Sequence, residues 1–171
     1  VLTLDAPLDN SYPIGKEIDV FEIDMNVIGT LQNPVSFTFI PAQGQIWHIV
    51  RFLFSMTHGT AGDLGLFGNL PKLINGAVLR GFDGESGRFR TFMNIKDNSD
   101  IKNNMYDVDF DTRSGGGGTY GTSGRGSIKI GTGAVPKLVA ANGDYFEILI
   151  QDDLSALESF RMKVQGHIEG L

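Results

Sequence analysis

A period-two alternation of apolar and polar residues restricts the fold of this sequence more than any other feature. The alternation is clearest in Phe21–Val27 and Val35–Phe39, and Tyr145–Gln151 is a further clear strand. Successive side chains of a strand point to opposite faces, so this pattern predicts half-buried β-strands. Only Asp152–Glu158 has a helical pattern, and we therefore expect helix in well under a fifth of the chain.

Two of the predicted strands have informative faces. Gln45–Thr57 is the longest, and both of its faces are largely apolar, which predicts a central strand that is covered on both sides. Arg88–Ile95 alternates more strictly. We expect Phe89, Met93 and Ile95 to share its buried face.

Glycine separates these strands. It accounts for 23 of the 171 residues, roughly twice the usual share of about 7%, and this excess favours turns between short strands. The segment 114–126 contains the run Gly115–Gly118. Because glycine loses the most conformational entropy on ordering, we expect a mobile loop there.

The strands combine into one domain in this interpretation. Eight or nine short strands without a repeat of fixed period predict an all-β fold, a jelly-roll-like antiparallel β-sandwich with little helix. A closed barrel is the alternative. Residues 1–17, interrupted by Pro7, Pro13 and Gly15, are predicted to form an N-terminal arm, and residues 18–171 the single sandwich domain.

Composition argues against several classes of function. The chain contains no cysteine, which excludes disulfides and thiolate metal sites. Its net charge of −6 disfavours nucleic acid as a partner, because such binding depends on neutralising phosphates. No apolar run approaches the length of a membrane-spanning helix. Gly116, Gly118 and Gly121 match a dinucleotide-binding spacing, but no helical pattern follows them, so no cofactor is predicted.

Acidic residues alternate along another predicted strand. Asp107, Asp109 and Asp111 lie on one face, about 6.8 Å apart, and lack the glycine and glutamate that follow in a calcium-binding loop. We interpret them as a solvated strand face. Calcium at a subunit contact is one alternative, and a glycan-active enzyme using Asp107, Asp109 or Glu147 is another.

Histidine and basic residues give weaker signals. His48, His58 and His167 lack the close spacing that is typical of metal ligands on a strand. Hydrogen-bonded structural roles are expected, with a metal site joining two of them across strands as the alternative. Arg88 and Arg90 share a predicted strand face and are interpreted as a charged outer surface that balances acidic residues nearby or on another subunit.

Several segments resemble a family of small virion structural proteins of tailed bacteriophages. The segments are Pro41–Arg51, Leu73–Arg80, Asn142–Leu154 and Gln165–His167. They are turn and strand motifs without catalytic signatures. The turn before the tryptophan reads Pro41-Ala42-Gln43-Gly44, where the family has its glycine one position earlier.

The resemblance implies a non-enzymatic protein of the virion, either a tail or neck component or a head-decoration protein. Its partners would be copies of itself and other virion proteins, with no catalytic, cofactor or metal residues. Apolar residues of the arm and charged or aromatic residues of the domain are the candidate assembly residues: Leu2, Leu4, Leu8, Trp47, Arg88, Arg90 and Tyr120. The alternative is a carbohydrate- or receptor-binding β-sandwich module, which would present exposed aromatic residues such as Trp47 or Tyr120.

Overall fold

The computed structural model describes residues 17–23, 27–58, 65–67, 70–97, 99–100, 105–114, 120–128, 137–157 and 159–170. For β1, β6 and β7 the description covers the backbone alone. The elements in chain order are β1 (Glu17–Ile23), β2 (Val35–Phe39), β3 (Gln45–His58), β4 (Ala77–Asp83), β5 (Arg88–Ile95), β6 (Met105–Ser114), β7 (Tyr120–Ile128), β8 (Lys137–Val139), the 3-10 turn η1 (Ala140–Asn142), β9 (Tyr145–Ile150) and β10 (Ser159–Gly170).

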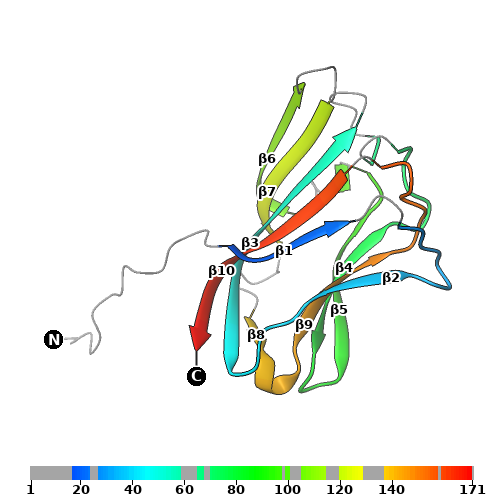
Figure 1. The fold of residues 1–171 in the computed structure, drawn as a ribbon. Helices are drawn as coiled ribbons and strands as arrows, with labels where there is room; N and C mark the ends of the chain where they lie inside the picture. The colour runs from blue at the N-terminus through cyan, green and yellow to red at the C-terminus, as the bar shows by residue number, and fades with distance from the viewer. Residues whose placement is uncertain are drawn as a thin grey trace.

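These strands form two antiparallel sheets (Figure 1). The larger sheet has the order β1-β10-β3-β7-β6, with β8 also paired to β3, and the smaller has the order β2-β9-β4-β5. Without the β6–β7 hairpin, eight strands remain. Lettered B to I in chain order, they read B-I-D-G and C-H-E-F, the strand order of a jelly roll. The predicted jelly-roll-like sandwich is thereby confirmed.

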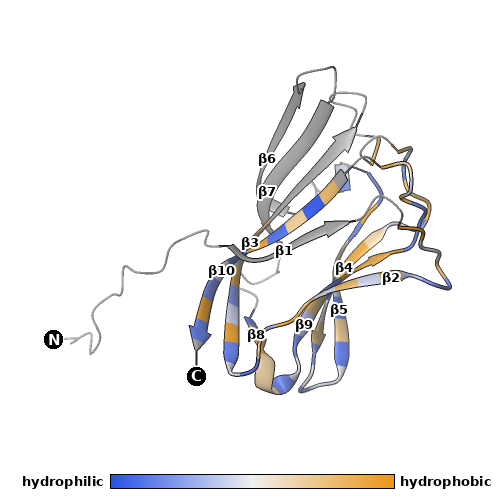
Figure 2. Cartoon of the chain, in the orientation of Figure 1, coloured by the Kyte–Doolittle hydropathy of each residue, from blue (hydrophilic) through white to orange (hydrophobic). Residues whose placement is uncertain are grey.

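Strand content agrees with the alternation in the sequence. Strands make up more than half of the described residues and helix only a small fraction, which confirms the expectation of a mostly β chain. The lower halves of β3 and β10 show the alternation directly as bands of hydrophobic and hydrophilic colour (Figure 2).

The long strand β3 lies at the centre of the larger sheet, which confirms its predicted central position. It pairs with β10 from end to end. On its other side, Ile46–His48 pair with β8 and Phe52–His58 pair with β7. The β6–β7 hairpin therefore extends the upper part of the larger sheet and projects beyond the smaller one (Figure 1).

The core fills the space between the two sheets. Aromatic side chains dominate it, and Phe52 of β3 meets Phe146 of β9 edge to face with ring centroids 5.6 Å apart. Fully buried residues include Phe39, Phe52, Phe67, Phe146, Phe160, Ile49, Leu79, Ile148, Ile150 and Leu154. The inward direction predicted for Phe146, Ile148 and Ile150 is correct.

A β-bulge changes the face assignment in β5. Leu79 pairs with Met93 but Arg80 pairs with Thr91, so Phe92 is the extra residue of β5. Met93 and Ile95 are buried in the core, whereas Phe89 lies against Phe82 and is 44% exposed. The expectation that Phe89 shares the buried face is wrong, because the bulge reverses the alternation between the two ends of β5.

Three other expectations need correction. The predicted Gly-rich loop 114–126 is wrong in part, because β6 continues to Ser114 and Tyr120–Ile128 forms β7. The boundary of the predicted arm 1–17 is also too late, since β1 already begins at Glu17; residues 1–16 lie outside the description. The strands β1 and β7 each pair with a neighbouring strand, and such long-range pairing is not visible in local composition.

The predicted helix at Asp152–Glu158 is the third correction. Residues 152–157 form bends and turns. Asp153 makes a bridge with Ile28, and the Asp152 carboxylate accepts hydrogen bonds from the backbone of the loop before β4. A helical backbone would break these contacts with distant segments, so residues 152–157 do not form a helix.

Candidate functional site

A row of apolar side chains crosses the outer face of the smaller sheet, opposite the core. Phe82 of β4 pairs with both Tyr145 of β9 and Phe89 of β5. The ring of Phe82 is 5.0 Å from that of Tyr145 and 4.9 Å from that of Phe89. Ile40 follows the last residue of β2, whose partner is Phe146, which places Ile40 level with Tyr145. We call Ile40, Tyr145, Phe82 and Phe89 the aromatic row.

A polar row lies beside the aromatic residues, two residues away along the chain in each case and therefore on the same face. Thr38 pairs with Glu147, Glu147 with Arg80, and Arg80 with Thr91. We call Thr38, Glu147, Arg80 and Thr91 the polar row. Both threonines are exposed, whereas Glu147 is only 5% exposed.

The polar row is held by a connected set of interactions. Arg80 Nε donates to Glu147 Oε1 at 2.5 Å, and Ser36 Oγ donates to Glu147 Oε2 at 2.6 Å. The Arg80 guanidinium also lies over the Phe89 ring, 3.8 Å from its centroid, in cation–π geometry. Glu147, which the sequence suggested as a catalytic acid or base, therefore has both carboxylate oxygens engaged in structural hydrogen bonds.

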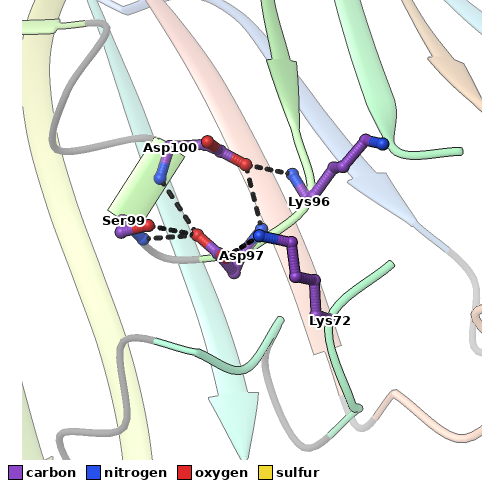
Figure 3. A network of polar contacts seen from close by, with 5 residues as sticks. All are labelled: Lys72, Lys96, Asp97, Ser99 and Asp100. Atoms are coloured by element: carbon purple, nitrogen blue, oxygen red, sulfur yellow. Dashed lines mark hydrogen bonds and ion pairs between the residues drawn. The ribbon is translucent and has the colours of Figure 1, made fainter. Parts of the chain in front are cut away.

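The other buried carboxylates also have structural partners. Asp97 follows β5, and its Oδ1 accepts hydrogen bonds from Ser99 and from the Asp100 backbone, while Lys72 Nζ lies 2.9 Å from its Oδ2 (Figure 3). Burial raises the pKa of Asp97, but the hydrogen bonds from Lys72, Ser99 and Asp100 outweigh it and hold the pKa below its ordinary value. The Asp144 carboxylate accepts hydrogen bonds from the backbone N–H groups of Gly84 and Val139 and so connects two turns.

The Asp97 network predicts a pH dependence of stability. A carboxyl whose pKa is lower in the folded state stabilises the fold above its unfolded pKa, here 3.8, and loses that contribution as the pH falls through the folded pKa. Replacing Asp97→Asn should lower the free energy of unfolding by about 1–2 kcal/mol at neutral pH. Urea denaturation between about pH 5 and about pH 2 should show a shallower decline for the variant. Equal slopes for both proteins would contradict this account.

Two of the three histidines meet on the outer face of the larger sheet. His48 of β3 and His167 of β10 are register partners, and their rings stack 4.4 Å apart. His48 Nε2 lies 3.0 Å from Glu169 Oε2. Burial lowers the pKa of His167, and His48 lowers it further. Within the described part of the chain, no three histidine or acidic side chains are placed to hold a metal ion.

The candidate assembly residues fall into three groups. Trp47 is buried in the core with its Nε1 donating to Gln45 Oε1, so its prediction as an interface residue or exposed sugar-stacking residue is wrong: its face of β3 meets the opposite sheet. Arg88 and Arg90 are exposed on β5, an edge strand. Leu2, Leu4 and Leu8 lie outside the described residues. Tyr120 begins β7, and its side chain lies outside the description.

A second surface lies at one end of the sandwich, where loops contact the turn after β9. Ile28 bridges Asp153, and the backbone N–H of Ile74 donates to the Asp152 carboxylate. Ile28, Leu31 and Ile74 are 61%, 55% and 81% exposed. We call these three residues the apolar loop end. Hydrophobic colouring runs along the loops in this corner of the molecule (Figure 2).

Neither surface follows from the sequence by itself. The aromatic row depends on the register of three strands and on the bulge in β5, and the apolar loop end depends on loops that are distant in sequence. In the part of the chain that the structure describes, no helix is long and apolar enough to span a membrane. No protein-family model, curated protein or solved structure matches the chain.

Proposed function

We propose that this chain is a non-enzymatic structural protein of a tailed-bacteriophage virion, assembled in multiple copies on the particle as a tail or neck component or as a head-decoration protein. The observation that carries the proposal is the apolar loop end. Large exposed apolar patches mark interaction sites, and this end of the sandwich gathers three exposed apolar side chains from two loops. A surface of this kind on each copy makes a weak contact that repeats in a symmetric assembly.

Two further observations support this function. Jelly rolls are a recurrent architecture of viral capsid proteins, although lectins also use them. The buried carboxylates Asp97, Asp144 and Glu147 accept hydrogen bonds that hold turns or neighbouring strands, which is the use expected in a scaffold. The segments that resemble virion proteins, Pro41–Arg51 and Asn142–Leu154 among them, include β9 and the first half of the central strand β3.

The proposal predicts self-association through the apolar loop end. The double substitution Ile28→Ser with Ile74→Ser should raise the concentration at which the protein self-associates by about tenfold or more, because two exposed isoleucines lose their apolar contacts. Sedimentation velocity over a concentration series measures this shift. Ile40→Ser, at the opposite end of β2, is the matched control and should leave self-association unchanged. A wild-type protein that stays monomeric, or a double variant that associates like wild type, would count against the proposal.

A further inference from the structure

The outer face of the smaller sheet carries two kinds of surface side by side. The aromatic row presents apolar groups from β4, β5 and β9 and from Ile40, the residue that follows β2, with Ile40 58% exposed at one edge and Phe89 44% exposed at the other. The polar row next to it presents hydroxyl groups from Thr38 and Thr91 and the guanidinium of Arg80, whose side chain is 29% exposed. Together they form an apolar strip flanked by hydrogen-bonding groups.

We infer that this face binds a saccharide, which lies along the aromatic row and forms hydrogen bonds with the polar row. A pyranose ring has an apolar C–H face that packs on aromatic rings and a rim of hydroxyl groups that need donors and acceptors. Aromatic side chains provide a large, rigid contact area. A ligand loses affinity when its hydroxyl groups are buried without a hydrogen-bond partner. The aromatic row supplies the apolar contact, and the polar row beside it supplies the hydrogen-bonding groups.

The hydrogen-bonding groups are already oriented. Arg80 is fixed by Glu147 on one side and by the Phe89 ring on the other, so little side-chain entropy is lost when a ligand binds. Among the described contacts Arg80 uses only Nε in its ion pair with Glu147, which leaves its terminal N–H groups for a ligand. Both oxygens of Glu147 are engaged by Arg80 and Ser36, so the inferred activity is binding without cleavage.

The dimensions and polarity of the face select the class of ligand. Four strands at the usual spacing span about 14 Å, longer than one sugar ring, which favours an oligosaccharide over a monosaccharide. An apolar side chain of a protein partner fits less well over Arg80, because it would bury the exposed part of the guanidinium without offering an acceptor.

The test is a titration of the isotope-labelled protein, followed by amide NMR shifts, with maltotriose, cellotriose, laminaritriose, galactotriose and the trimer of N-acetylglucosamine. At least one should bind with a dissociation constant of about 1 mM or tighter, with shifts confined to β2, β4, β5 and β9. Phe89→Ala should weaken binding about tenfold or more, and Phe89→Leu, which keeps an apolar side chain but no aromatic face, should also weaken it. Ile74→Ala removes an exposed apolar residue from the other end and should bind like wild type.

Three results would overturn the inference. They are no binding by any of the five sugars, shifts that map to another surface, or equal affinity of wild type and Phe89→Leu in spectra that show both folded. The outcome is independent of the proposed assembly, because the double variant that tests self-association alters Ile28 and Ile74, and neither residue belongs to the aromatic row.

Discussion

Replacing Phe146→Ala should lower the free energy of unfolding by about 3–5 kcal/mol, the range for removing a large aromatic side chain from a packed core. Phe146 joins the two sheets: its ring meets Phe52 of the larger sheet and Phe92, the bulge residue of β5, with centroids 5.6 and 5.2 Å away. It also lies against Gly81, where an added Cβ would come within 2.9 Å of the ring. The surroundings therefore have little freedom to fill the resulting cavity.

Urea denaturation of wild type and variant measures this effect. Phe146→Leu serves as the control and should cost less, about 1–2 kcal/mol, because it keeps most of the buried volume. A loss below about 1 kcal/mol for Phe146→Ala would be typical of a surface position, and it would show that the two sheets do not pack through this residue.

Replacing Asp152→Ala should destabilise the protein by about 2–3 kcal/mol, because several backbone donors lose one shared acceptor. The Asp152 carboxylate accepts from the N–H groups of Ile74, Asn75 and Gly76, and so fixes the loop that leads into β4. Gly76 has φ of +99°, a conformation that glycine adopts at low cost, so the local backbone depends on this arrangement.

Asp153→Ala is the matched control for Asp152→Ala. The neighbouring Asp153 carboxylate accepts from Ser155 two residues away, and its loss should cost about 1 kcal/mol or less. Hydrogen exchange should accelerate at Ile74, Asn75 and Gly76 in the Asp152 variant alone. Equal destabilisation by both substitutions would contradict the assigned role of Asp152.

Local alternation predicts where several of the strands begin and end. The observed β5 and β9 start where the apolar–polar pattern starts, and β3 extends one residue beyond its predicted end. In these strands the residue types of neighbours along the chain are enough to predict the strand. The same reasoning misses β7, because its sequence is rich in glycine and its strand conformation accompanies pairing with β3 and β6.

The candidate surfaces depend on register, which alternation does not specify. The single extra residue Phe92 decides that Phe89 joins Phe82 outside the core, and the sequence contains no mark of a bulge there. Trp47 is the opposite case. Its strand was predicted to be apolar on both faces, yet only the two-sheet topology shows which face is buried.

An electron-microscopy map of the virion tests the central claim, multi-copy structural assembly, most directly. We predict density for several symmetry-related copies of this two-sheet jelly roll, with Ile28 and Ile74 covered by a neighbouring copy or by another virion protein. A map of the complete particle in which this fold is absent would contradict the claim. So would a map in which the apolar loop end of every copy faces solvent.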